Sequence, residues 1–265
     1  SEDMRNHSLK RVKMKQDIDR ALKDDEFEVY YQAQVDAKTG RYKGMEALVR
    51  WRHPEYGFIP PVKFLPLAEE IGMIVEIDRY VMKKAMQDVV MWRKSGYDVQ
   101  KVSINLSIKH LQQDSFIEVV KKSLDETGCN GEWLEFEVTE THIMNSYDDS
   151  VSKLKKMNAL GIKVSIDDFG TGYSSLSYLK FLPIDKLKID KSFIDDLLDD
   201  HEDVSIVKSI IWLCKCLNLS VIAEGVETKE QSDFLVEIGC DLQQGYLFAK
   251  PQAKDDFEKE FLKRN

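Results

Sequence analysis

The chain has 265 residues, a formal net charge of −9 and the apolar fraction of an ordinary globular protein. This length accommodates one large α/β domain or two small ones. The acidic balance argues against binding duplex nucleic acid through the overall field, although a small anionic substrate is compatible with a pocket rich in cations. No apolar run reaches the roughly 18 residues that a membrane span needs.

The sequence begins with Ser1 rather than Met, and no signal peptide opens it. We therefore expect a cytoplasmic domain of a longer protein, with an upstream sensor or regulatory domain, in a parent that is compatible with a membrane anchor. The five histidines have no metal-binding spacing. The cysteines fit neither a zinc knuckle nor a CxxC redox pair, so we expect buried free thiols in a reducing compartment at Cys129, Cys214, Cys216 and Cys240.

Residues 1–24 form a lead-in segment ahead of the main domain, which we place at 25–265. Apolar residues recur at near-helical spacing over 8–24, where most other positions are polar and many are basic. Two interpretations fit this basic amphipathic helix equally well. It is either a linker that transmits a signal from an upstream domain or a helix packed on the base of the following domain.

From residue 28 onward, strand-like and helix-like runs alternate. A tight turn at Gly40 makes the first two strands an antiparallel hairpin. Strands are expected at 28–35, 44–51, 102–107, 134–140, 163–169, 186–190, 220–226 and 241–248, and helices at 62–71, 78–95, 115–127, 148–160, 174–181, 203–217 and 229–238. Eight strands alternating with helices predict an α/β fold of the TIM-like (β/α)₈ type, with the first strand antiparallel.

Polar side chains interrupt these apolar strands on one face only. Successive strand residues point to opposite faces, so Asn105 shares a face with Ser103, and Glu137 shares one with Glu135. The apolar faces are then free to pack on the outer helices, which leaves the polar faces in the lumen. Glu224 has the wrong parity for this arrangement and is expected to act from the end of its strand.

The polar set near the strand ends consists of hard oxygen donors: Glu46, Asn105, Glu137, Asp167, Asp168 and Glu224. So many carboxylates require cations nearby, and oxygen ligands without thiolate or imidazole suit Mg²⁺ or Mn²⁺. Adjacent aspartates allow one carboxylate to bridge two ions, which is the arrangement that assists phosphoryl transfer. Lys188 supplies a fixed cation for developing charge or for positioning a water. The sequence thus indicates a metal-dependent hydrolytic site.

The run Glu46-Ala47-Leu48, followed by Val49-Arg50-Trp51, resembles the signature of EAL-domain cyclic di-GMP phosphodiesterases, which act in bacterial second-messenger signalling. The resemblance covers about residues 9–251 as an ordered series of motifs. These are YYQAQ at 30–34, LAEEIG at 67–72, SINLS at 103–107, EVTE at 137–140, DDFGTGYSSL at 167–176, LKIDKSFI at 187–194, AEGVET at 223–228 and QGYLFAKP at 244–251.

The resemblance implies hydrolysis of cyclic di-GMP to linear pGpG with two Mg²⁺ or Mn²⁺ ions. It implies that Glu46, Asn105, Glu137 and Asp167 hold one metal, and that Asp167 and Asp168 hold the second. Glu224 and Lys188 would support the second metal or orient the attacking water, and the family's general-base role falls on Glu224. Glu140 would tether the loop after Asp168. The positions expected to contact ligand are Gln32, Leu48, Arg50, Asp190, Glu227 and Gln244.

The chain departs from the family pattern at Ala33, where the family usually has proline. Every matched catalytic-type position carries the expected residue, which favours an active enzyme over a catalytically silent cyclic di-GMP receptor. A glycosidase using two carboxylates ranks last, because it does not need Lys188 or adjacent aspartates. The resemblance also implies a homodimer through the helix expected at 174–182, although core packing explains the apolar residues there equally well.

Overall fold

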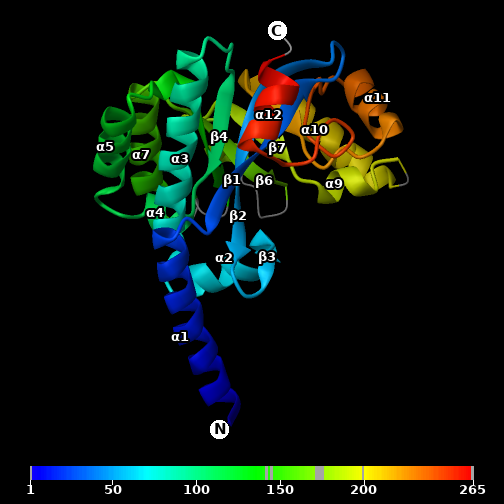
Figure 1. Cartoon of the computed structure of the whole chain (residues 1–265). Helices are drawn as coiled ribbons and strands as arrows, with labels where there is room; N and C mark the ends of the chain where they lie inside the picture. The colour runs from blue at the N-terminus through cyan, green and yellow to red at the C-terminus, as the bar shows by residue number, and fades with distance from the viewer. Residues whose placement is uncertain (1, 141–142, 144–145, 171–175, 199, 264–265) are drawn as a thin grey trace.

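The structure is a computed structural model that describes residues 2–140, 143, 146–170, 176–198 and 200–263. Its centre is a closed barrel of eight strands (Figure 1). They are β1 (Phe27–Asp36), β2 (Arg41–His53), β4 (Lys101–Asn105), β5 (Leu134–Thr139), β6 (Lys163–Phe169), β7 (Lys186–Ile189), β8 (Ser220–Ala223) and β9 (Leu242–Gln243). The predicted TIM-like barrel is confirmed.

Strand order around the barrel is β1-β9-β8-β7-β6-β5-β4-β2, and a β1–β2 pairing closes it. Strand β1 is antiparallel to both β2 and β9, whereas the other neighbours in the ring are parallel. The antiparallel first strand is therefore confirmed. Two short strands, β3 (Gly57–Ile59) and β10 (Gln252–Ala253), pair with β2 and β1 outside the ring.

The last barrel strand is much shorter than the 241–248 run that the sequence predicted. β9 ends at Gln243, and the chain then turns against the segment after β8. A Cβ atom added at Gly245 would lie 2.0 Å from the carbonyl oxygen of Val226, so only glycine permits this approach. Backbone bonds from Val226 N to Gln244 O and from Leu247 N to Val226 O fix the turn.

Helices follow most strands and cover the barrel from outside (Figure 1). Their bounds are α2 (Pro61–Glu70), α3 (Ile74–Lys94), α4 (Ile108–Leu111), α5 (Phe116–Thr127), α7 (Tyr147–Ala159), α8 (Leu176–Leu179), α9 (Ser192–Asp195), α10 (His201–Leu217), α11 (Lys229–Ile238) and α12 (Lys254–Phe257), with a 3₁₀ turn at Gly131–Trp133 and a π turn at Glu258–Leu262. Most predicted helices are confirmed within a few residues. The sequence also offers the hydroxyl of Ser174 as a cap for the helix expected at 174–181, and that residue lies outside the described residues.

Helix boundaries follow local chemistry. Thr228 and Gln231 form a reciprocal capping box at the start of α11. Gly128 ends α5 and Gly239 ends α11, both in the left-handed conformation that glycine adopts without a Cβ clash. Both helices therefore stop where the local sequence supplies a glycine.

Helix α1 (Glu2–Lys23) projects away from the barrel, with the N-terminus at its far end (Figure 1). Its last turns bury Ile18 and Ala21 and contact α2 and α3. The Arg20 guanidinium lies 2.8 Å from the His53 imidazole at the end of β2. The interpretation that this helix packs on the base of the barrel is therefore wrong about the location. The residues that α1 contacts lie beside the C-terminal end of β2, at the opposite end of the barrel from its base. The division of the chain at residue 24 and the signal-transmitting role stay predictions.

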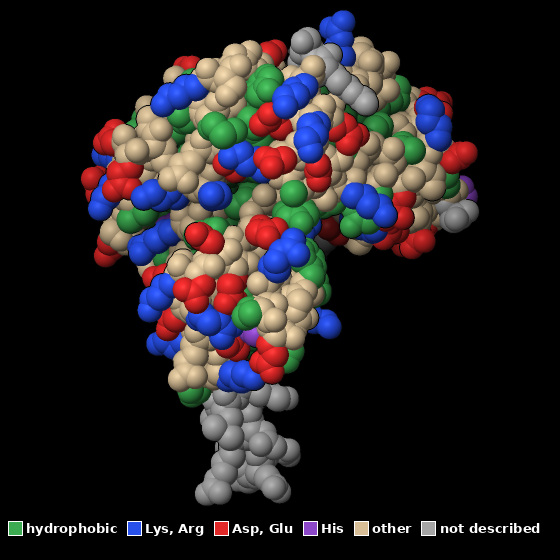
Figure 2. All heavy atoms as spheres, viewed as in Figure 1, with side chains coloured by type: hydrophobic (Ala, Val, Ile, Leu, Met, Phe, Trp, Pro, Cys, Tyr) green, Lys and Arg blue, Asp and Glu red, His purple; other side chains and the backbone are tan. Residues whose placement is uncertain are grey.

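Figure 2 shows acidic and basic side chains mixed over the face that it presents, with hydrophobic side chains in small separate areas. None of the helices in the described part of the chain combines the length and apolar character that crossing a bilayer demands.

Docking of α1 is testable by a matched pair of substitutions. We predict that Ile18→Ala lowers the free energy of unfolding by about 2–5 kcal/mol, because it opens a cavity under the helix. Val12→Ala, at a side chain that is 57% exposed, should change stability little. Urea unfolding followed by circular dichroism measures both. Equal effects would show that α1 does not pack as described.

Candidate active site

The lumen of the barrel carries polar side chains in two layers. In the lower layer, Lys186 forms an ion pair with Glu135 at 2.8 Å, and Ser103 donates a hydrogen bond to the same carboxylate. The upper layer, two residues further along each strand, holds Glu137 and Lys188. The predicted strand parity is confirmed, because these inward residues from β4, β5 and β7 meet one another.

Lys188 is the centre of the upper layer, and its side chain is 1% exposed. Its ammonium lies 2.5 Å from Glu137, 2.7 Å from Glu224, 3.2 Å from Asp167 and 3.9 Å from Glu46. Burial alone would lower the pKa of Lys188, but these carboxylates raise it well above the ordinary value. The amine therefore stays protonated.

Glu46 is held by two amides. Asn105 donates to its Oε1 at 2.7 Å, and Gln244 donates to its Oε2 at 2.6 Å. Gln32 lies directly across from Glu46 in the β1–β2 pairing. The structure thus brings the predicted ligands Glu46, Asn105, Glu137, Asp167 and Glu224 together around one cation.

Asp168 differs from its neighbour Asp167. Its backbone has φ 54°, an uncommon left-handed conformation for a residue other than glycine, and its amide donates to Asp167 Oδ1 at 3.0 Å. Burial, with Asp167 and Asp190 adding repulsion, raises the pKa of Asp168 to about 6. The strained turn places the second carboxylate beside the first, on the more exposed side of the site.

Glu224 follows the last residue of β8, as its parity predicted. The next residue, Gly225, has φ 70°, and a Cβ atom there would lie 2.3 Å from Lys191 Cγ. Burial, reinforced by Asp167 and Glu46, raises the pKa of Glu224 to about 8 even though Lys188 lowers it. A carboxyl group with that pKa can accept a proton near neutral pH.

The donor set fits a hard cation. Four carboxylates face one ammonium, which leaves a buried excess of negative charge. Glu137 Oε1 is buried and accepts no hydrogen bond, so one ligand oxygen is available. Among the described side chains, no group of three or more His, Cys, Asp or Glu is already arranged to hold an ion.

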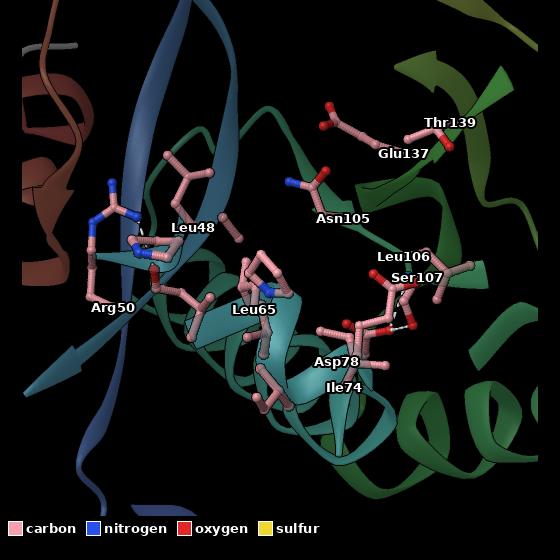
Figure 3. Close-up of a pocket in the computed structure, with 17 residues that line it drawn as sticks. Leu48, Arg50, Leu65, Ile74, Asp78, Asn105, Leu106, Ser107, Glu137 and Thr139 are labelled. Atoms are coloured by element: carbon pink, nitrogen blue, oxygen red, sulfur yellow. Dashed lines mark hydrogen bonds between the residues drawn. The ribbon is translucent and has the colours of Figure 1, made fainter. Parts of the chain in front are cut away.

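A pocket of about 320 Å³ adjoins this cluster. Asn105 and Glu137 lie on one side of it and Leu48 and Arg50 on the other, with Leu65 from α2 between them (Figure 3). Most of its remaining lining is apolar and comes from α2 and α3. The pocket thus joins a charged end to an apolar end.

The other predicted ligand-contacting residues are divided between the buried lumen, which holds Gln32 and Gln244, and more exposed positions. Arg50 packs over the Tyr30 ring at 5.6 Å and donates to the Val49 carbonyl. Asp190 accepts from Ser192, and Glu227 is paired with Lys191 at 2.5 Å.

Glu140 begins the segment after β5, but the loop that it was expected to tether includes 171–175, outside the described residues. Its anchoring role stays a prediction.

Sequence reasoning missed Asp78 on α3. Its carboxylate accepts from both the amide and the hydroxyl of Ser107, and so fixes the turn that follows Asn105. Asp78 is 9% exposed. A carboxylate among the apolar positions of a helix was the only available signal, and it did not indicate a partner.

Ala33 is fully buried in the core and alternates with Gln32 and Gln34, so its side chain points away from the lumen. Its replacement of proline leaves the polar layer intact.

The four cysteines are free, but Cys216 is exposed, so the expectation that all are buried is wrong for that residue. It lies on α10, where neighbouring positions alternate between core and solvent.

A closed barrel with its polar side chains at the C-terminal ends of the strands has the layout of a TIM-like enzyme. The family model for the EAL domain matches residues 15–251. The chain belongs to the EAL domain family.

Among similar proteins of Pseudomonas aeruginosa are the cyclic di-GMP phosphodiesterase NbdA and the bifunctional diguanylate cyclase/cyclic di-GMP phosphodiesterase MucR. They are 41% and 40% identical to this chain, and each alignment covers 95% of it. The chain spans about a third of their lengths, 32% and 37%.

Solved structures agree. The PaMucR phosphodiesterase in complex with c-di-GMP superposes with a TM-score of 0.89 at 40% identity, covering 92% of this chain and 99% of that one. The EAL enzyme Bd1971 with cAMP and cyclic di-GMP bound gives 0.89 at 32% identity, over 96% of this chain and 69% of that one.

The raised pKa of Glu224 predicts a pH-dependent stability. Between the ordinary value of 4.5 and about 8, the folded protein keeps a proton that the unfolded chain releases, so the free energy of unfolding falls as the pH rises. We predict that Glu224→Gln reduces this fall by up to about 1.4 kcal/mol per pH unit. Urea unfolding in a chelator, from about pH 5 to 8, measures it. Glu237→Gln, at an exposed position of α11, is the control. Equal slopes for both variants would contradict the assignment.

Proposed function

We propose that this domain hydrolyses cyclic di-GMP to linear pGpG. The observation that carries the proposal is the buried excess of carboxylates around Lys188, next to a pocket with one charged and one apolar end. Family membership and relatives named as cyclic di-GMP phosphodiesterases support the same substrate.

Two Mg²⁺ or Mn²⁺ ions are the proposed cofactors. Glu46, Asn105, Glu137 and Asp167 would hold one ion, and Asp167 with Asp168 the second, supported by Glu224. Such ions supply Lewis acidity and a water of lowered pKa. The oxygen-only donor set and the unpartnered Glu137 Oε1 support this assignment.

Two residues of the chain act on protons and charge. Glu224 accepts a proton from the attacking water, for which its raised pKa suits it. Lys188 remains protonated, balances the carboxylates and stabilises negative charge that develops on the phosphate oxygens.

The pocket and its rim bind the substrate. Arg50 offers a guanidinium to a phosphate oxygen, and Leu48 with Leu65 contacts the flat face of a base. Gln32, Asp190, Glu227 and Gln244 complete the proposed ligand contacts. The cyclic dinucleotide thereby places a phosphodiester over the carboxylates.

The decisive assay incubates purified protein with cyclic di-GMP and Mg²⁺, with and without chelator, and identifies products by mass spectrometry. We predict that Glu46→Gln lowers turnover by more than about 100-fold, because it removes a metal ligand. Glu135→Gln, one layer below in the same lumen, is the matched control and should keep turnover.

Equal turnover of Glu46→Gln and the parent would show that the ligand assignment is wrong. A parent that binds cyclic di-GMP but leaves it intact with either metal would instead establish the receptor alternative. The same protein preparations serve both measurements. Turnover is measured with metal, and binding of cyclic di-GMP is measured by calorimetry in chelator, where no hydrolysis is expected.

The domain is further proposed to form homodimers through residues 174–182. Phe181 is 67% exposed and Tyr178 44% exposed in the described part of this segment, which supports a contact surface. We predict that Phe181→Glu shifts the domain from dimer to monomer in gel filtration with light scattering. Met91→Glu, at a side chain 37% exposed on α3, is the control. A parent that is monomeric at high concentration with full activity would refute the proposal.

An upstream sensor or regulatory domain and a cytoplasmic location complete the proposal. The longer lengths of the relatives support additional domains, and free thiols suit a reducing compartment.

A further inference from the structure

Three buried glutamines form a continuous chain of amides that ends on Glu46. Gln34 donates to Gln244 Oε1 at 3.1 Å. Gln244 Nε2 donates to Glu46 Oε2 at 2.6 Å and to Gln32 Oε1 at 3.2 Å. Gln32 Nε2 donates to the Ala249 carbonyl at 3.0 Å. All three side chains are at most 7% exposed, so water does not compete for these groups.

The acceptors at the two ends of this amide network determine which atom donates in each of its hydrogen bonds. The Ala249 carbonyl and the Glu46 carboxylate only accept, so the amide nitrogens of Gln32 and Gln244 must face them. Gln244 Oε1 is then left pointing at Gln34, which must donate. If Gln244 rotated by half a turn, its oxygen would face the Glu46 carboxylate, and two acceptors would repel each other in a buried site.

Room for Gln34 depends on the residue opposite. Gly44 is its partner in the β1–β2 pairing, and a Cβ atom added there would lie 2.9 Å from Gln34 Oε1 and 3.3 Å from the Lys101 carbonyl. Glycine therefore leaves the space in which the Gln34 amide sits. The lower lumen is shaped to hold this donor.

We propose that Gln34 is a positioning residue that fixes the amide of Gln244, and through it the rotamer of Glu46. The inference rests on the proposed role of Glu46 as a metal ligand. Gln34 acts by donating to Gln244 Oε1, because without this donor the buried oxygen loses a hydrogen bond and the Gln244 amide is held less firmly against Glu46. Groups that orient a ligand in this way typically change metal affinity by 10–100-fold when removed.

The test is Mn²⁺ binding to the folded domain by titration calorimetry. Gln34→Met keeps the size of the side chain and removes the donor, so the dissociation constant for Mn²⁺ should rise by about tenfold. Gly44→Ala displaces the same amide from the opposite strand and should act in the same direction. It also provides a second route if Gln34→Met folds poorly.

Gln252→Met is the matched control. Gln252, on β10 beside β1, also donates a hydrogen bond from its side-chain amide to a carboxylate, with Nε2 2.6 Å from Glu260 Oε2. The same substitution there should lower stability but leave Mn²⁺ affinity unchanged. Gln34→Met that binds Mn²⁺ as tightly as the parent, or a Gln252→Met that weakens binding equally, would overturn the inference.

A measurement on the unmodified protein separates this inference from the proposed function. In ¹⁵N-labelled parent without metal, the side-chain amide protons of Gln34 and Gln244 should exchange slowly with solvent, because both are buried and bonded. Fast exchange overturns the amide chain. Slow exchange in a parent that binds no Mn²⁺ would support the network of side-chain amides and would refute the proposed metal site instead.

Discussion

The structure of the site depends on one buried ammonium. Lys188 reaches the axis of the barrel from β7, and carboxylates from β2, β5, β6 and the end of β8 converge on it. A lone lysine buried to this extent would lose its proton, and the carboxylates without it would repel one another. Each charge is therefore stable only because the others are present, and the barrel is the scaffold that forces them together.

The same constraint explains why the site is poised for cations. One ammonium does not neutralise four carboxylates, and the burial that raises the pKa of Glu137 and Glu224 makes a proton or a metal ion the available compensation. If the site holds metal ions as proposed, protons and those ions would compete for the same oxygens. Stability and metal binding would then be linked through this competition.

Around the charges, uncharged groups determine direction. Asn105 and Gln244 hold the two oxygens of Glu46, and Asp78 holds the turn that follows Asn105. The pocket then extends from these polar groups to the apolar surfaces of α2 and α3 (Figure 3). A ligand with an anionic centre and flat apolar ends matches that layout, whereas a purely ionic one would leave half of the pocket unfilled.

The sequence by itself determined the barrel, the antiparallel first strand and the identity of the polar lumen residues, because alternation along a strand and glycine at helix ends are local properties. Only the tertiary structure decided that Lys188 is the centre, that Gln34 and Asp78 support the site, and that α1 packs beside β2 and not on the base. These facts depend on distances between residues far apart in the chain, such as Gln34 and Gln244. No periodicity or spacing encodes such distances, since they arise only when the strands close into a ring.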